Sequence, residues 1–299
     1  MFRWLVTIAL VSLAAVSPPV PASAPSSRVV PVYRGVEKFG WARLSAPASA
    51  AAELYRTLVV APYAASCSFE TGPFRTLGAD SSPFEAITVA QQIEAGKAID
   101  HVEAGLASAM AALPMPTPVR VCVFAGALDG ALFHLGGVGG VALGNGQINV
   151  FAYPTVNGFE RLRYTAAHEY HHEVLRRTSA AWLGDPLGAM VGEGKADQFA
   201  VSRFPALRPK HTQPLSAAEL KQVFAVFQTM RRGDVATFRR DFMIAAQSPL
   251  PLWAGYRLGF EVAGACVAAR PASAAAWLDV PAQACLEAFL DTPRGRALR

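Results

Sequence analysis

The pattern H-E-x-x-H occurs once in this chain and comprises His168, Glu169, Tyr170, His171 and His172. On an α-helix, side chains four residues apart lie on one face, so His168 and His172 can bind one Zn²⁺ ion through imidazole nitrogens at about 2.0–2.1 Å. Glu169 is rotated by about 100° around the helix and points beside the ion, where an attacking water would lie. Zinc lowers the pKa of such a water towards about 7, and Glu169 can take its proton. These residues therefore predict zinc-dependent hydrolysis.

A third zinc ligand is available in Glu193, which follows His172 by 21 residues and falls on the next expected helix. Two histidines and one carboxylate form a ligand set of catalytic zinc sites, in which the fourth position is left to water. Asp197 lies four residues after Glu193, on the same helix face, where it can accept a hydrogen bond from a ligand histidine and orient its ring. The alternative is that Glu193 and Asp197 are surface charges.

Two helices must position these side chains. We expect the first to begin at a capping box formed by Asn157 and Glu160 and to end at the basic pair 176–177. The second begins at Asp185, a favourable N-cap that is followed by a proline at the first helical position, and it runs to Pro205.

The remaining elements are expected from local signals. A capping box at Ser82 and Glu85 predicts one helix over 82–113, and an apolar run predicts a buried strand over 119–124. Asn145-Gly146 indicates a hairpin with a type I′ turn, whose second strand is Gln147–Ala152. That strand is either buried or a free sheet edge to which an extended peptide substrate adds. Further helices are expected from Ser216 and over 253–269 and 275–290. Residues 25–50, rich in Pro, Ser and Ala, read as a late-ordering or flexible lead-in.

The strings HEYHH at 168–172 and EGKAD at 193–197 resemble the gluzincin branch of zinc metallopeptidases. Together with WAGY at 253–256, before Gly259, they are similar to a poorly characterised bacterial family of predicted zinc-dependent proteases, over roughly residues 118–290. The lysine of EGKAD departs from the family pattern, in which a small apolar residue is more usual.

The resemblance implies a role for each matching residue. His168, His172 and Glu193 would bind zinc, Glu169 would act as general base and then as acid, and Asp197 would support a ligand histidine. It also implies an α+β, zincin-like fold of gluzincin type, with a small mixed sheet and a mainly helical body.

Such a hydrolase also needs a hydrogen-bond donor for the oxyanion. Tyr256 is our choice over Arg257 and His171, although no spacing ties any of them to the site. Tyr256 can instead be a core aromatic residue, and His171 projects from a different side of its helix than His172 and reads as a surface or interhelix histidine. The other histidines, His101, His134 and His211, have no partner at a ligand spacing.

Composition narrows the class of protein. The chain has 299 residues, of which 52% are hydrophobic and 16% charged, so it can bury a large core. Its 27 Lys and Arg against 22 Asp and Glu are spread along the chain, and the lack of a basic block argues against nucleic acid as a partner.

The first residues read as a secretory signal peptide, because Arg3 precedes an apolar stretch over 4–16 and small residues follow at 22–24. We expect cleavage near residues 22–24, a secreted or periplasmic protein, and no membrane span in the mature chain. The mature residues 25–299 are expected to form one metallopeptidase domain, with the sheet and the HExxH helix in 25–184 and the glutamate ligand in the helical part 185–299.

Export permits disulfides, and the four cysteines have no C-x-x-C spacing that would suggest a zinc or redox motif. Three pairings are possible, of which our choice joins neighbours, Cys67 with Cys122 and Cys266 with Cys285.

The sequence therefore predicts a secreted zinc peptidase that hydrolyses peptide bonds of a peptide or protein substrate. Two alternatives remain: a non-catalytic module that binds zinc or peptides, and a zinc hydrolase of a non-peptide amide or ester. Glu169 favours an enzyme, because a site that only binds zinc has no use for a glutamate beside its first ligand. The sequence indicates no oligomeric state.

Overall fold

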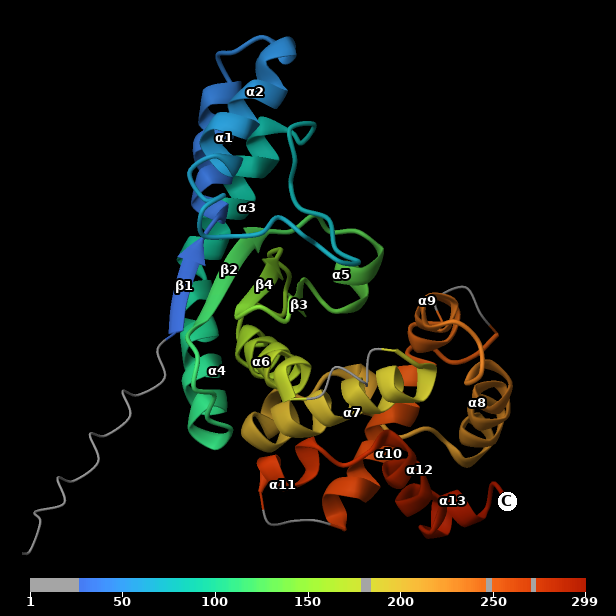
Figure 1. The fold of residues 1–299 in the computed structure, drawn as a ribbon. Helices are drawn as coiled ribbons and strands as arrows, with labels where there is room; N and C mark the ends of the chain where they lie inside the picture. Colours follow the sequence, from blue (N-terminus) through green and yellow to red (C-terminus); the bar gives the residue numbers. More distant parts are fainter. Residues whose placement is uncertain (1–26, 179–183, 246–248, 270–272) are drawn as a thin grey trace, which may run out of the picture.

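A computed structural model describes residues 27–178, 184–245, 249–269 and 273–299 (Figure 1). The chain has an α+β fold, in which one small sheet is combined with many helices. The strands are β1 (Ser27–Pro31), β2 (Val119–Ala125), β3 (Val138–Ala142) and β4 (Gln147–Ala152). The helices are α1 (Tyr33–Arg43), α2 (Ala51–Tyr55), α3 (Pro83–Ala95), α4 (Ala98–Ala112), α5 (Gly130–His134), α6 (Leu162–Thr178), α7 (Pro186–Arg203), α8 (Ala217–Met230), α9 (Val235–Phe238), α10 (Ala254–Ala268), α11 (Ala274–Leu278), α12 (Ala282–Leu290) and α13 (Pro293–Arg296).

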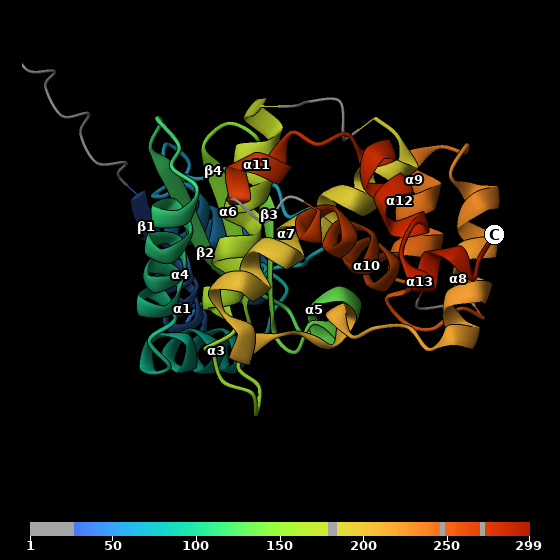
Figure 2. The same ribbon diagram turned by 90° about the horizontal axis from the view of Figure 1, so that it is seen from below.

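The four strands form a mixed sheet in the order β1-β2-β4-β3. β1 pairs parallel to β2 and β2 parallel to β4, whereas β3 runs antiparallel to β4. Helix α6 lies against β3 and β4 and separates the sheet from α7 and the C-terminal helices (Figures 1 and 2). The HExxH helix is therefore held between the sheet and the helical part of the chain.

The strand Gln147–Ala152 has the predicted bounds but not a free edge. Its Phe151 is paired with Phe124 of β2 on one side and with Gly139 of β3 on the other. Every residue of β4 is buried, including the polar Gln147 and Asn149, whose side-chain amides donate to the carbonyl oxygens of Ser68 and Glu70. The edge strand beside α6 is β3.

The hairpin between β3 and β4 has a longer turn than the expected type I′ turn. Residues 143–146 connect the strands, and the positive φ angles lie at Gly144 and Gly146 rather than at Asn145. The buried carboxylate of Glu173 accepts hydrogen bonds from the backbone N–H groups of Gly144 and Gly146, at 2.8 and 2.5 Å. Glu173 belongs to α6, so these bonds fix the edge strand over the HExxH helix.

The expectation of a flexible lead-in over residues 25–50 is wrong for the described part of this segment. Residues 27–31 form β1, an edge strand paired with β2, and α1 follows and buries Phe39 and Tyr33. The alanines and serines that suggested flexibility cluster near residue 50, whereas Val29, Val30 and Val32 provide the apolar residues a strand and its end require.

The long helix expected over 82–113 is two helices, α3 and α4. Lys97 has a left-handed backbone with φ of 54°, next to Gly96, and ends the run of helical hydrogen bonds there. Pro83 occupies the first helical turn as expected, but the Ser82 side chain makes no capping hydrogen bond. Segment 275–290 is likewise divided into α11 and α12, before Pro281.

Helix α6 begins later than expected. Asn157 lies in a turn, and Gly158 takes a positive φ of 62°, so that no capping box forms and the helix starts at Leu162. The start of α7 agrees with the prediction, because the Asp185 side chain accepts a hydrogen bond from the Gly188 N–H and Pro186 takes the first helical position. The capping box of Ser216 with Glu219 at the start of α8 is also present.

Helices α7 and α10 cross at two glycines. A Cβ atom on Gly194 would lie 2.0 Å from the Gly259 carbonyl oxygen, and one on Gly259 would lie 2.4 Å from the Met190 carbonyl oxygen. Only glycine allows the two backbones to approach this closely. The crossing places Glu193 of α7 near Tyr256 of α10.

Both expected disulfides are confirmed. Cys67 is bonded to Cys122 of β2, and Cys266 of α10 is bonded to Cys285 of α12. The expected signal peptide, residues 1–24, lies outside the described residues. None of the helices in the described ranges is long and apolar enough to cross a membrane.

Candidate metal centre

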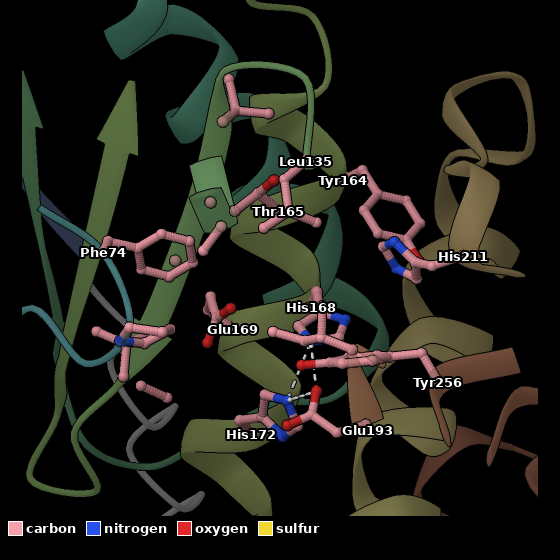
Figure 3. A pocket seen from close by; sticks show the side chains of 18 of the residues that line it. Phe74, Leu135, Tyr164, Thr165, His168, Glu169, His172, Glu193, His211 and Tyr256 are labelled. Atoms are coloured by element: carbon pink, nitrogen blue, oxygen red, sulfur yellow. Dashed lines mark hydrogen bonds and ion pairs between the residues drawn. The ribbon is translucent and has the colours of Figure 1, made fainter. Parts of the chain in front are cut away.

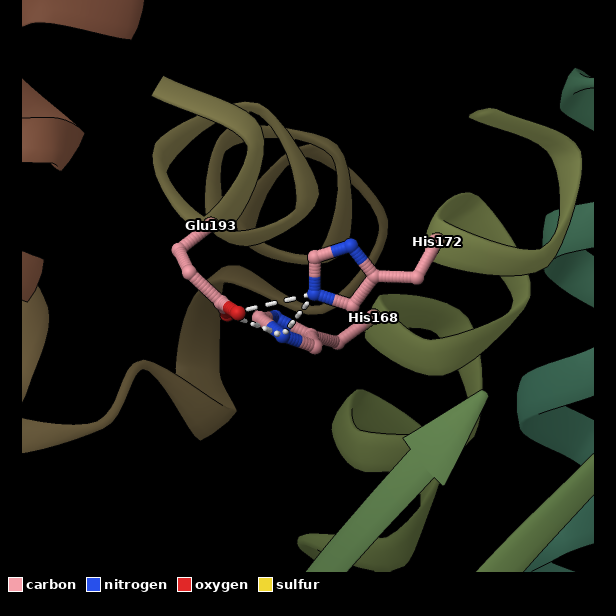
Figure 4. Close-up of side chains that lie close together, drawn as sticks. All are labelled: His168, His172 and Glu193. Carbon is pink, nitrogen blue, oxygen red and sulfur yellow. Dashed lines mark hydrogen bonds and ion pairs between the residues drawn. The ribbon is translucent and has the colours of Figure 1, made fainter. Parts of the chain in front are cut away.

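Helix α6 presents His168 and His172 on the side that faces α7, and Glu193 of α7 points towards them (Figure 4). The three side chains are nearly buried, with exposed fractions of 10%, 7% and 12%. The Nε2 atoms of the two histidines are 3.0 Å apart, and Glu193 Oε2 lies 3.3 Å from His168 Nε2 and 3.1 Å from His172 Nε2. The structure thus brings together all three predicted ligands.

The spacing of these atoms fits a zinc ion. Zinc–ligand bonds of about 2.0–2.1 Å at tetrahedral angles place neighbouring ligand atoms about 3.3 Å apart. The three observed separations, 3.0 to 3.3 Å, are close to that value. Among the residues that the structure describes, one group of side chains has ligand atoms close enough together to hold a metal ion, and it consists of His168, His172 and Glu193. A carboxylate and two imidazoles are ligands that zinc accepts readily.

Asp197 lies behind His168, one turn after Glu193 on α7. Its Oδ1 atom is 2.9 Å from His168 Nδ1 and also accepts a hydrogen bond from the Tyr164 hydroxyl, at 2.7 Å. An Nδ1–H that points at Asp197 leaves the Nε2 lone pair of His168 free to face the metal site. Burial is the largest single effect on His168 and disfavours the imidazolium form. The charges and hydrogen bonds of Asp197, Glu193 and Glu169 together outweigh it and raise the pKa of His168 well above its ordinary value.

His211 is the residue that sequence reasoning missed. Its Nε2 lies 3.3 Å from Asp197 Oδ1, and its ring packs against Trp253 and Tyr256. No local spacing relates His211 to the HExxH helix, because it comes from a short turn 14 residues after Asp197. Tyr164 carried a usable signal, since it precedes His168 by four residues and so shares its helix face.

Glu169 lies on the β3 side of the centre, apart from the three ligands (Figure 3). A Cβ atom on Gly140 of β3 would come within 2.5 Å of Glu169 Cγ, so the strand packs directly on this side chain. Burial raises the pKa of Glu169, although the two histidines and a hydrogen bond from the Ala142 backbone act against it. Burial also raises the pKa of Glu193, but the charges and hydrogen bonds of His172 and His168 outweigh it and hold this pKa well below its usual range. The two carboxyl groups are therefore set to different tasks.

Tyr256 extends from α10 across the centre, with its hydroxyl towards His168 and Glu193 (Figure 3). The preceding Trp253 has a left-handed backbone, with φ of 65°, and its N–H donates to the Ile244 carbonyl at 2.7 Å, which fixes the start of α10. Burial and the charges of Glu193 and Asp197 raise the pKa of Tyr256 well above its ordinary value. The hydroxyl therefore keeps its proton and remains a hydrogen-bond donor.

The other two candidates for the oxyanion donor, Arg257 and His171, lie elsewhere. Arg257 donates to the carbonyl oxygens of Gln213 and Pro214 and pairs with Glu219, away from the centre. His171 is fully buried beside Phe199 of α7, so it is an interhelix histidine. Lys195 is also buried, and its ammonium donates to the carbonyl oxygens of Leu278 and Val280, at 2.8 and 2.7 Å. The unusual lysine thus anchors a C-terminal turn and points away from the ligands.

A cavity of about 160 Å³ opens over His168, Glu169, His172 and Glu193. Its walls include β3, the start of α6, and the aromatic residues Phe74, Trp253 and Tyr256. A second, larger groove shares Pro73, Glu193 and Tyr256 with it and continues along α8 and α9. The cavity and the groove therefore meet at the metal centre, beside Glu193 and Tyr256.

The chain has no match among curated proteins or among solved structures. The sequence model of one family matches residues 100–287, more than half of the chain, and this family is described as "Predicted Zn-dependent protease (DUF2268)". The matched region contains α6 and α7, hence both zinc motifs, and also Tyr256 and His211. The metal of this chain is zinc, for which His168, His172 and Glu193 converge as possible ligands. The chain belongs to this family of predicted Zn-dependent proteases.

Proposed function

We propose that this protein is a secreted zinc peptidase of gluzincin type, which hydrolyses peptide bonds with Glu169 as general base. The observation that carries the proposal is the position of Glu169. This side chain is buried between the edge strand β3 and the three expected zinc ligands, and it is not itself one of the ligands. A glutamate placed there is next to both the metal and the place where a substrate backbone would lie. The HExxH helix beneath a mixed sheet also supports a zincin-like fold.

His168, His172 and Glu193 would hold the ion, and Asp197, backed by His211, would orient His168. Bound zinc supplies a Lewis acid that polarises the substrate carbonyl and lowers the pKa of water. Glu169 takes a proton from the attacking water as the C–O bond forms, and gives it to the leaving amine as the C–N bond breaks. Burial is the largest effect on the pKa of Glu169 and raises it, which makes the carboxylate a stronger base towards the proton of water.

The edge strand β3 is the proposed place of substrate binding. One side of β3 is bonded to β4, and the other side is not paired with any strand in the described part of the chain. An extended peptide can add to such an edge through backbone hydrogen bonds. Gly139 and Gly140 let the ring of Phe74 and the side chain of Glu169 pack directly on the two faces of this strand, which places Glu169 beside the proposed peptide. Binding to β3 therefore replaces the expected binding to 147–152.

We assign Tyr256 as the donor to the oxyanion. Replacing Tyr256 with Phe removes the hydroxyl and keeps the ring that packs on His211 and Trp253. We expect kcat to fall by about 10²- to 10³-fold, with zinc content unchanged, because a lost oxyanion donor costs that much. Tyr153→Phe, in which the altered tyrosine lies outside the cavity, is the matched control. A Tyr256→Phe variant with wild-type kcat would assign this tyrosine to the core instead.

The proposal includes export and a single mature domain. Residues 1–24 would be removed as a signal peptide, and residues 25–299 would form one domain, with the sheet and α6 in 25–184 and the glutamate helix in 185–299. The two disulfides support an oxidising destination, outside the cell or in the periplasm.

The proposal is tested by zinc-dependent cleavage of a mixed peptide library, read by mass spectrometry. We expect the zinc-loaded protein to cut peptides, a zinc chelator to abolish cutting, and added zinc to restore it. Amide and ester dyes are assayed in parallel as non-peptide substrates. A folded protein that holds about one zinc per chain and cuts no peptide would contradict the proposal. Hydrolysis of the dyes alone would then indicate a non-peptide hydrolase, and no hydrolysis would indicate a binding module.

A further inference from the structure

An arginine lies in the cavity wall at one end of the metal centre. Arg161 immediately precedes α6 and is seven residues, or two helical turns, before His168. It lines the cavity together with Leu135, Tyr164 and Thr165, which lie together at the end of the cavity opposite His172 (Figure 3). Its Nη1 donates to the Leu135 carbonyl at 2.8 Å, and this bond holds the guanidinium at the N-terminal end of β3.

The charge of Arg161 has no carboxylate partner among the residues that the structure describes, since no ion pair connects it to an aspartate or glutamate. Burial lowers its pKa, and the phenol of Tyr164 is the group that opposes this effect. A partly buried guanidinium usually forms an ion pair, because desolvation of an unpaired charge is unfavourable. The planar guanidinium suits a carboxylate well, because it can form two parallel hydrogen bonds.

The rest of the cavity is also positively biased. Arg176, one turn after His172, lines the cavity near the other end of β3, where its side chain lies against Gly144. Arg239 also lines the cavity. The acidic residues in the lining are Glu169 and Glu193, and both belong to the metal centre. The charges of the arginines are therefore left to act on a substrate.

We propose that the site selects carboxylate-bearing peptides, and that Arg161 is the specificity residue that binds the carboxylate. This inference rests on the proposed peptidase function, because it concerns the same cavity. Seven helical residues correspond to about 10 Å along α6, and an extended peptide advances about 3.3 Å per residue. The carboxylate is therefore expected about two to four residues from the scissile bond, on the side of the N-terminal end of β3. An acidic side chain or a free C-terminus can supply it.

The test measures peptide retention as well as cleavage. Four matched pools of decapeptides with randomised neutral residues carry either one Glu or one Gln, and either a free or an amidated C-terminus. Each pool is passed over immobilised, zinc-loaded protein that carries Glu169→Gln to prevent cleavage, and retained peptides are quantified by mass spectrometry. The same background then carries Arg161→Gln, Arg161→Lys or Arg163→Gln. Arg163 is the matched control, because it donates to His101 Nδ1 and does not line the cavity.

We expect a carboxylate pool to be retained about tenfold or more over the pool with Gln and an amidated end, as a charge-assisted hydrogen bond implies. Retention of both Glu pools identifies a side-chain carboxylate, whereas retention of both free-acid pools identifies the C-terminus. Arg161→Gln should abolish the preference, Arg161→Lys should keep part of it, and Arg163→Gln should leave it unchanged. Thermal unfolding and zinc content of each variant establish that it is folded.

Equal retention of all pools, no retention, or an unchanged preference in folded Arg161→Gln overturns the assignment. Cleavage of the pools by the chain with Glu169 intact is measured separately. No cleavage of any pool would refute the peptidase, while the retention data would still decide whether Arg161 binds carboxylates.

Discussion

Replacing Glu169 with Gln is expected to lower kcat/KM for peptide cleavage by about 10²- to 10⁴-fold while leaving zinc bound, as loss of a general base does. The amide has nearly the shape of the carboxylate, so the packing of this side chain on Gly140 is retained. It cannot take a proton from water, however. The ligands His168, His172 and Glu193 are unaltered, and the zinc content should stay at about one per chain.

The matched control for this variant is Glu160→Gln, the same substitution at an exposed position just before α6. It should leave cleavage and zinc content at wild-type values. Rates are measured with a peptide from the library experiment, and zinc by elemental analysis of the same samples. Full activity in a zinc-loaded Glu169→Gln variant would refute the role of Glu169 as base. Loss of zinc would show instead that Glu169 helps to hold the metal.

The second large effect is expected for His172→Ala, which removes one of the three ligands. We expect zinc content to fall from about one per chain to near zero, since two ligands do not form a stable zinc site. The loss should also appear in stability. Zinc at about 100 times its Kd stabilises a folded protein by about 2.7 kcal/mol, so the wild-type Tm should rise on addition of zinc. The Tm of the variant should not.

His101→Ala is the control for this substitution, because His101 accepts a hydrogen bond from Arg163 and lies outside the cavity. It should bind zinc like the wild type. Both proteins are stripped of metal, titrated with zinc in competition with a chelator, and followed by thermal unfolding. Wild-type zinc affinity in a folded His172→Ala protein would move the metal centre away from this histidine.

The parts of the centre that sequence predicted are those governed by local geometry. His168, Glu169 and His172 follow one another within a single helical turn, and the helical repeat alone places the two histidines on one face and the glutamate beside them. The start of α7 is equally local, since the cap Asp185 and Pro186 act on their own first turn. With that start determined, Glu193 and Asp197 must share a face of α7. Both disulfides join neighbouring cysteines in the sequence, and this choice of pairing was correct.

The predicted bounds of several helices and strands were wrong, because tertiary contacts outweighed the local sequence signals there. The lead-in expected over 25–50 contains β1, whose short apolar run is a strand only because β2 pairs with it. The helix start predicted at Asn157 and Glu160 is replaced by a turn at Gly158, and α6 starts at Leu162. The break between α3 and α4 at Lys97 is not marked by a proline in the sequence. It lies beside Gly96, against which the ring of Phe159 packs.

The sequence by itself predicted the side chains that converge as a possible zinc site and the glutamate that we propose as the base, because their placement depends on residues within one helical turn or on one helix. Only the tertiary structure decided that β3, and not β4, is the edge strand over the site, because strand order depends on pairing between segments far apart in the chain. It also decided that His211 supports Asp197, that Gly194 and Gly259 bring Tyr256 over the metal ligands, and that Arg161 faces the cavity without a carboxylate partner in the described residues. Such contacts join helices and turns whose separation in sequence carries no periodic signal, so packing alone sets them.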